Sequence, residues 1–197
     1  MKLTPAFLAL VILSTVSAVA QDAAILKAME KYKGVSTVTA TVVRTKHSAA
    51  LADDAVIAGT FTYTSPNKMD IQFNAGADRM YMDGSTFGMV VDGQESVARG
   101  ATQTQFENLL KVFRSIFLGD TTVGDIAELA EVAAETNGNL RTITVSQKVD
   151  PTQKKHRQMF SSFVLTFDVK AGVFKSLRMN ERGENYTHYD FSDFRLK

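Results

Sequence analysis

Residues 59–73 read GTFTYTSPNKMDIQF and contain the clearest indication of the fold. Two runs alternate between apolar and polar side chains, one on each side of a turn at residues 65–67. In the second run Met69, Ile71 and Phe73 share one face of an extended chain, and the polar residues between them share the other. A strand with one apolar face and one solvent-exposed polar face is typical of antiparallel sheets. The stretch therefore predicts two neighbouring strands whose apolar face needs a cover.

The same alternation recurs along most of the chain. Asp83-Gly84 and Asp92-Gly93 are hairpin-turn signals, and turn signals about ten residues apart indicate a β-meander rather than βαβ units. We expect strands at 37–43, 60–64, 68–73, 79–82, 86–91, 140–147, 160–169, 173–180 and 185–191, the last with room to continue to residue 196. Together they predict a mainly β (α+β) fold with a single antiparallel sheet of about eight to ten strands.

Three segments carry helical patterns. Ile25, Met29 and Tyr32 share one face of a first helix. A longer apolar stripe runs through residues 102–118 and consists of Phe106, Leu109, Leu110, Phe113, Ile116 and Phe117. Residues 124–135 predict a further short helix, with Ile126, Leu129 and Ala133 turned inward. The helices are therefore expected before the sheet and in its middle.

The first residues predict an export signal. Lys2 supplies a positive charge, an apolar run follows, and residues 18–20 (Ala-Val-Ala) fit the small-x-small rule for cleavage before Gln21. We expect a cleaved signal peptide at 1–20 and a single domain at 21–197 in the periplasm. The absence of cysteine excludes disulfides, thiolate metal ligands and a lipidated cysteine at the cleavage point.

Composition and motifs give little support to catalysis or nucleic-acid binding. Lys and Arg total 22 against 21 Asp and Glu, so the basic excess of a nucleic-acid-binding protein is missing. His47, His156 and His188 lack metal-ligand spacing, and the first two fall in expected loops at 47–54 and 150–158. No Gly-x-Ser-x-Gly elbow or phosphate-binding glycine loop occurs. We expect no enzyme activity, no metal and no cofactor, although a carboxylate pair of a secreted hydrolase stays open because such pairs are spatial.

The apolar residues suggest what the sheet is for. The chain has 13 Phe and 8 Met but no Trp, and methionine suits surfaces that accept varied apolar shapes. An ordinary core is one interpretation of this content. Two or three short helices cover little of so large a sheet, however. The sheet therefore either closes on itself or curves and leaves a cavity lined by Phe and Met.

The pattern resembles a known family. Residues 59–73 resemble the Gly-x-(apolar)-x-(apolar)-x-x-Pro-x-x-(apolar)-x-(aromatic) stretch of the periplasmic outer-membrane lipoprotein carriers, the LolA-like family. Residues 83–87 resemble the Asp-Gly hairpin of these carriers, and residues 163–167, the turn at Gly172 and the chain from Leu177 onward resemble their late strands. The resemblance covers nearly all of the chain after the signal, by pattern more than by identity.

The resemblance implies an incomplete, strongly curved antiparallel β-barrel with helices as a lid over its concave apolar face. In this family the acyl chains of a lipoprotein lie between lid and sheet. The carrier takes them from an inner-membrane lipoprotein-releasing transporter to an outer-membrane acceptor. We therefore expect a monomeric carrier of lipidated protein or lipid, with no nucleic-acid partner. Matched positions give Met69 and Ile71 as cavity-lining residues and Met29 on the first helix, and periodicity adds Phe61, Phe73, Leu109, Leu110, Phe113 and Phe117.

Two departures from the family leave the cargo and the control of the lid open. The family often has an arginine just before the turn proline, where it is thought to tie the lid shut, and this chain has Ser65. The family's long C-terminal extension has no counterpart after Phe191. The alternative is an envelope sensor or regulator, or a lipid-binding protein on the same fold, that binds a protein partner rather than transporting cargo.

Overall fold

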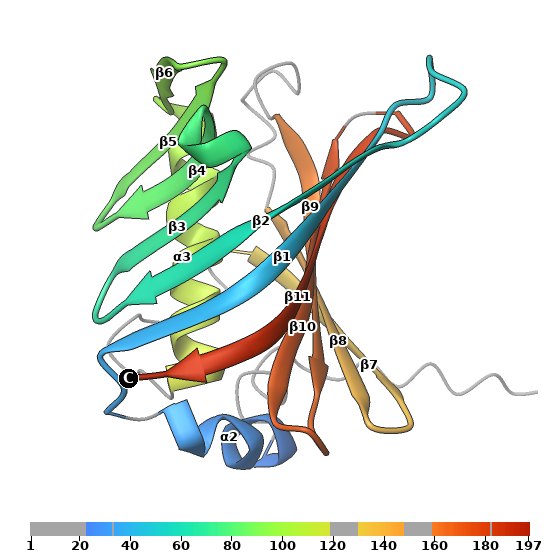
Figure 1. Ribbon diagram of the computed structural model, residues 1–197. Coiled ribbons are helices and arrows are strands. Elements are labelled where there is room, and N and C mark those ends of the chain that lie inside the picture. Colours follow the sequence, from blue (N-terminus) through green and yellow to red (C-terminus); the bar gives the residue numbers. More distant parts are fainter. Residues whose placement is uncertain (1–22, 33, 119–129, 148–158, 182) are drawn as a thin grey trace, which may run out of the picture.

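The computed structural model describes residues 23–32, 34–118, 130–147, 159–181 and 183–197. The predicted export signal and the predicted loop at 150–158 lie outside these residues. Eleven strands in the described part form one antiparallel sheet, accompanied by two α-helices (Figure 1). A mainly β fold with one open, curved sheet is thus confirmed.

The strands, in chain order, are β1 (Thr37–His47), β2 (Ala55–Thr64), β3 (Lys68–Phe73), β4 (Asp78–Asp83), β5 (Thr86–Val91), β6 (Gln94–Val97), β7 (Ala130–Asn137), β8 (Leu140–Gln147), β9 (Phe160–Asp168), β10 (Val173–Glu181) and β11 (Tyr186–Leu196). The helices are α2 (Ala23–Met29) and α3 (Ala101–Leu118), with short 3-10 turns η1 (Glu30–Tyr32) and η2 (Asn74–Gly76). Within the described ranges, no helix has the length and apolar character needed to cross a membrane.

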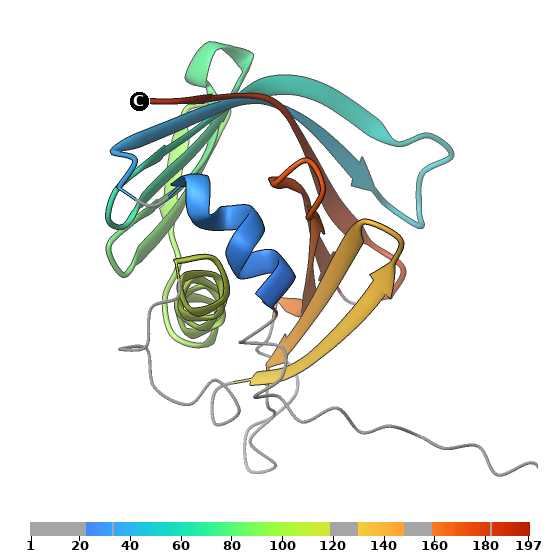
Figure 2. The same cartoon turned by 90° about the horizontal axis from the view of Figure 1, so that it is seen from below.

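The path of the chain places a helix over the sheet. Strand order is β6-β5-β4-β3-β2-β1-β11-β10-β9-β8-β7, so one meander runs outward from β1 and a second returns inward to β11, which pairs with β1. β6 and β7 are therefore the two edges, and the segment that joins them has to pass from one edge to the other. That segment contains α3. Seen from below, the sheet curves around α2 and α3, which lie on its concave side (Figure 2).

The core lies on this concave side. On β11 Thr187, Tyr189 and Phe191 are buried, and the residues between them are more exposed. The same two-residue period buries Val42 and Phe167 completely, each with 0% of its surface exposed. Inward side chains of both meanders therefore share one apolar cluster, which the helices cover.

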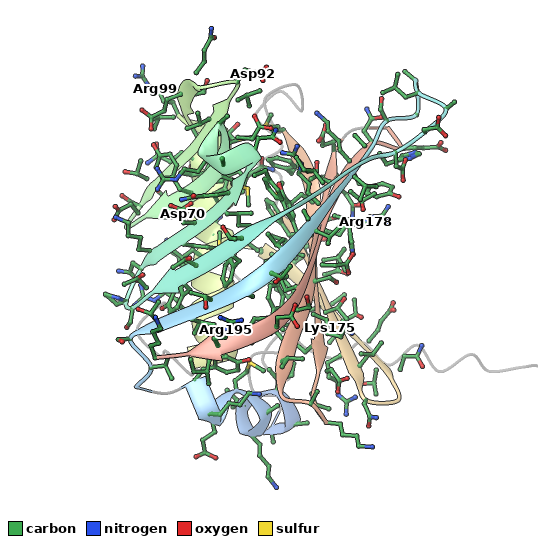
Figure 3. The ribbon with its side chains drawn as sticks, viewed as in Figure 1. Asp70, Asp92, Arg99, Lys175, Arg178 and Arg195 are labelled. Carbon is green, nitrogen blue, oxygen red and sulfur yellow. The ribbon has the colours of Figure 1, made fainter. Side chains whose placement is uncertain are left out.

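The outer face of the sheet is polar. Arg79 forms an ion pair with Asp70, and the guanidinium carbon of Arg178 lies 3.7 Å from the ring centroid of Tyr186. Figure 3 shows charged side chains spread over this face, among them the labelled Asp70, Lys175, Arg178 and Arg195. Charged and polar side chains therefore face the solvent on the side of the sheet that has no helical cover.

Strands with their own turn signals match the sequence prediction most closely. β3, β5 and β8 have the expected bounds, and β11 continues to Leu196. β6 was not expected, since its four residues are all exposed and lack an apolar face. The prediction that His47 opens a loop was wrong: it ends β1, and its ring stacks on Tyr186 with centroids 4.8 Å apart.

The helix predicted at 124–135 is wrong over the part that the structure describes. Residues 130–137 form β7, which pairs with β8 across the Asn137–Leu140 turn, and Ala133 is exposed instead of inward. The alanines and glutamates of this segment favour a helix by intrinsic propensity, but pairing with β8 along its whole length overrides that weak preference. Residues 124–129 of the predicted helix, with Ile126 within them, lie outside the described residues.

Candidate functional site

A narrow apolar cavity lies between α3 and the concave face of the sheet, with a volume of about 50 Å³. Its lining comprises Phe61, Tyr63, Asn67, Met69, Ile71, Met82, Leu109, Leu110, Leu165, Phe174, Leu177 and Phe191. Apart from Asn67 and the hydroxyl of Tyr63, these side chains are apolar. The lining contains no charged side chain, so the cavity suits a hydrocarbon chain and not a polar substrate.

The cavity is much smaller than a pocket for a drug-sized ligand, which typically measures roughly 300–1,000 Å³. Met69 and Met82 line it, and methionine adapts to new shapes more easily than branched side chains do. Entry of a long chain therefore requires α3 to move away from the sheet and the lining to repack.

The first half of α3 is firmly attached to the sheet through Gln105, which is only 2% exposed. Its side-chain amide donates a hydrogen bond to the carbonyl oxygen of Phe160 at 2.6 Å, and the N–H of Phe160 donates to its amide oxygen at 3.3 Å. The glutamine thereby satisfies both backbone groups of Phe160, at the start of β9, much as a neighbouring strand would.

Phe106 adds an aromatic anchor beside Gln105. Its ring stacks on Phe87 of β5 with centroids 3.4 Å apart and meets Phe160 of β9 edge to face at 5.4 Å. β5 and β9 belong to the two different meanders. The first half of α3 therefore bridges both arms of the open barrel.

The second half of α3 borders a separate, more open cleft. This cleft has a volume of about 310 Å³ and is lined by Asn67, Gly84, Ser85, Glu107, Leu110, Lys111 and Arg114. Asn67 and Leu110 belong to both the cavity and the cleft, so the two spaces adjoin. The side-chain oxygen of Asn67 is buried and has no hydrogen-bond partner within the described ranges.

The rim between cavity and cleft is formed by the turn that follows β2. The hydroxyl of Tyr63 donates to the carbonyl oxygen of Pro66 at 2.8 Å. Burial raises the pKa of Tyr63 above its ordinary value, while the positive charge of Arg114 and a hydrogen bond with Ser65 act in the opposite direction. Arg114 of α3 therefore lies close enough to this turn to influence it electrostatically.

α2 closes one end of the barrel. Ile25 and Met29 are 1% and 3% exposed, and Nζ of Lys31 donates to the carbonyl oxygen of Ala171 at 3.2 Å. At the same turn Gly172 leaves no room for a side chain, because a Cβ there would lie 2.9 Å from the carbonyl oxygen of Ala28. The α2 helix thus packs against the β9–β10 turn and forms an end cap of the barrel.

The structure brings together five of the residues predicted to bind cargo: Phe61, Met69, Ile71, Leu109 and Leu110 line the cavity. Met29 instead belongs to the end cap α2, on its buried side. Phe73 lies farther along β3, with its ring centroid 4.6 Å from the guanidinium carbon of Arg44. The side chains of Phe113 and Phe117 lie outside the described residues.

Seven lining residues were missed. Tyr63 shares its face of β2 with the lining residue Phe61, and Met82 shares its face of β4 with the buried Met80, so alternation could have identified both. Four more come from the second meander, namely Leu165, Phe174, Leu177 and Phe191. No local signal identifies these four, because their place opposite β2 and β3 depends on the β1–β11 pairing. The seventh, Asn67, belongs to the turn.

Other chemical groups are dispersed over the molecule. The described residues contain no group of three His, Asp or Glu side chains able to hold a metal ion. His47 lies 2.7 Å from Asp54 and His188 lies 3.1 Å from Asp190. Both histidine–acid contacts lie outside the cavity lining.

No protein-family model and no curated protein matches the sequence. Solved structures similar to this chain include a DUF1329 family protein from Desulfovibrio piger ATCC 29098, with 10% identity, a TM-score of 0.43, and coverage of 89% of this chain and 92% of that one. A LolA superfamily protein from Nitrosomonas europaea has 11% identity, a TM-score of 0.40, and coverage of 89% and 93%. The Mycobacterium tuberculosis lipoprotein LppX has 12% identity, a TM-score of 0.36, and coverage of 91% and 96%. Identity this low says nothing about cargo.

Proposed function

We propose that this protein is a periplasmic carrier that binds the acyl chains of a lipoprotein, or of another lipid, and shuttles them from the inner to the outer membrane. The observation that carries the proposal is the apolar cavity beneath α3, because the lining of this cavity has no charged side chain. The LolA-like sequence pattern supports it. An inner-membrane lipoprotein-releasing transporter and an outer-membrane acceptor are the partners that the proposal requires, and one protomer suffices.

The small volume of the cavity fits a carrier that has to release its cargo. Each buried methylene contributes about 0.8 kcal/mol, so a chain of roughly 16 carbons gains on the order of 10 kcal/mol. Cargo held with all of that energy would leave slowly. Because α3 and the sheet pack together when no chain lies between them, their separation offsets part of the gain and weakens net binding.

The first test is native mass spectrometry of the protein purified from periplasm without detergent. We expect co-purifying lipid or acylated peptide, and we expect Met69→Asp combined with Leu110→Asp to remove it, because a carboxylate in the cavity would be buried without a partner. Both side chains are only partly buried, which favours retention of the fold.

A matched control uses the same two residue types outside the cavity. Met159→Asp with Leu51→Asp changes side chains that are 49% and 66% exposed, and this variant should keep its cargo. Circular dichroism checks that both variants fold. A clean unbound mass for the wild type, even after incubation with lipoprotein-bearing membranes, would contradict the carrier.

That outcome would favour the sensor or regulator that binds a protein partner. The sheet edges give this alternative its specific support, since β6 is exposed at all four residues and β7 at six of eight. Backbone groups on the outer side of an edge strand can pair with a strand of another chain. Loss of partner binding on introducing proline into β7, with the cavity intact, would identify this mode.

A further inference from the structure

Asn67 lies at the boundary between the apolar cavity and the adjoining cleft, and it lines both of them. Backbone hydrogen bonds fix the turn that carries it. The N–H of Gly84 donates to the carbonyl oxygen of Asn67 at 3.1 Å. On the other side of the turn, the N–H of Ser65 donates to the carbonyl oxygen of Ser36 at 2.9 Å. Neighbouring segments therefore hold the backbone from which the side chain of Asn67 extends.

The turn itself does not require asparagine at this position. Asparagine is favoured in turns because it tolerates a positive φ, or because its side-chain oxygen accepts a hydrogen bond from a nearby backbone N–H. Asn67 is not among the described residues with a positive φ. Its side-chain oxygen is buried and has no hydrogen-bond partner in the described part of the chain. Neither local reason accounts for this asparagine.

The cavity lining has no hydrogen of its own to offer the oxygen of Asn67. Besides Asn67, only Tyr63 has a polar side-chain group in the lining, and its hydroxyl donates to the carbonyl oxygen of Pro66 at 2.8 Å. The other lining side chains are apolar. A buried acceptor without a donor is unfavourable, so a ligand that supplies a donor beside Asn67 removes that cost.

Entry of a chain would uncover this oxygen. Leu110 of α3 lines the cavity and the cleft together with Asn67, so a chain that displaces α3 from the sheet also separates the helix from this rim. The chain then lies among apolar side chains, and the first polar atoms that follow it lie beside Asn67. At that point an amide link presents an N–H, whereas an ester link presents acceptors only.

We propose that Asn67 is a specificity-determining residue that accepts a hydrogen bond from the amide N–H of an N-acylated cargo. The inference rests on the proposed function and specifies its substrate class: an acyl chain attached to an amine through an amide, in preference to one attached to a hydroxyl through an ester. Both links have a carbonyl group, so the preference comes from the N–H. A site with a buried polar group disfavours the analogue that leaves this group unpaired.

The test compares three uncharged palmitoyl amphiphiles. N-(methoxyethyl)palmitamide has its amide N–H as the only donor, methoxyethyl palmitate has an ester oxygen in its place, and the N-methyl derivative of the amide keeps the nitrogen without the hydrogen. Each is radiolabelled and distributed between phosphatidylcholine vesicles and the purified protein, and the bound fraction gives its affinity. We expect the wild type to favour the secondary amide over the ester about tenfold more strongly than Asn67→Leu does. Partitioning into the vesicles cancels in this comparison.

The variant and its control change one residue type at two turns. Asn67→Leu removes the acceptor, keeps a side chain of similar size, and should lose the preference while still binding the ester. Asn139→Leu makes the same change at an exposed position in the β7–β8 turn, outside the cavity and the cleft, and should behave as the wild type. The N-methyl derivative tests the proposal without any variant, because the wild type should bind it no better than the ester.

The outcomes separate the two proposals. Failure of the wild type to bind any of the three amphiphiles would overturn the carrier itself. Binding of all three with the same preference in the wild type and in Asn67→Leu would overturn the role of Asn67 and leave the carrier standing. Equal affinity for the secondary amide and its N-methyl derivative would show that the N–H is not recognised, and this result would also contradict the role of Asn67.

Discussion

Tyr189 is a buried tyrosine on the inner face of β11, with 3% of its surface exposed. Its hydroxyl has a weak hydrogen bond to the sulfur of Met80 at 3.8 Å. Burial raises the pKa of Tyr189 to about 12, although the charge of Arg44 acts against the shift. Because the folded state favours the neutral phenol, its contribution to stability is complete below the ordinary pKa of about 10 and is lost as the pH rises toward 12.

We therefore predict an alkaline loss of stability that depends on this single hydroxyl. Between pH 10 and 12 the free energy of unfolding of the wild type should fall by about 2–3 kcal/mol more than that of Tyr189→Phe. Urea titrations at a series of pH values measure the difference. Tyr186→Phe, on the outer face, serves as control and should follow the wild type. Parallel pH profiles for the wild type and Tyr189→Phe would exclude Tyr189 as the cause.

Among the elements, α3 is attached to both meanders and also packs against α2. Gln105 and Phe106 fix its first half to β9 and β5, and its second half borders the cavity and the cleft. If α3 opens as a lid, we expect Gln105 and Phe106 to be its pivot and Leu110 to move away from the turn that contains Asn67. Uptake of an acyl chain then requires α3 to separate from the turn that contains Asn67.

A covalent link between helix and turn should block this opening. The chain has no cysteine of its own, so Leu110→Cys with Asn67→Cys can be joined selectively by a short bismaleimide. We expect the joined protein to lose the ability to take up labelled lipid from vesicles. The same double variant, treated with a monofunctional maleimide of similar size, should retain some uptake because its helix still moves. Equal uptake by the joined and unjoined forms would show that α3 is not the lid.

Local patterns predicted the elements that carry their own evidence. β3 alternates without error between two turns, and its bounds were correct. β7 was misjudged because its alanines and glutamates favour a helix, and only pairing with β8 makes them a strand. β6 was missed because an exposed four-residue edge has no apolar period to detect. The sequence therefore predicts strands with a buried face well and edge strands poorly.

The cavity could be predicted only in part, for a similar reason. Met69, Ile71 and Leu110 lie in strongly periodic segments, and both their faces and their roles as lining residues were expected. Phe174 and Leu177 line the same cavity from β10, on the other side of the seam between the meanders. Their proximity to β3 depends on the curvature of the whole sheet, which no local spacing encodes.

At the scale of the whole molecule, the two meanders are joined by a single strand pair. β1 and β11 pair from Val38–Leu196 to His47–Tyr186, with one irregularity between Thr39 and Thr41. The seam is reinforced inside, where the rings of Phe61 and Phe191 meet edge to face at 5.2 Å. The arms of the arc end in edge strands with one neighbour each.

Hydrogen exchange should follow this architecture. We predict the slowest amide exchange in β1 and β11, which lie at the middle of the strand order, and the fastest among the strands in the edge strands β6 and β7. Mass spectrometry after timed exposure to D₂O measures the order. Exchange in β1 that is as fast as in β6 would mean that the seam opens readily and that each meander is a separate cooperative unit.

The seam also imposes an order of events on synthesis. It joins Val42 to Phe191, so the arc cannot close until almost the whole sequence has been made. Contacts between segments so far apart form late, because the intervening chain must first be gathered together. A nascent chain that holds only β1 to β6 lacks the strand that completes it and stays loosely folded. Delay of this kind keeps a polypeptide unfolded for longer, which would suit passage through a narrow secretion channel if residues 1–20 act as the export signal that the sequence predicts.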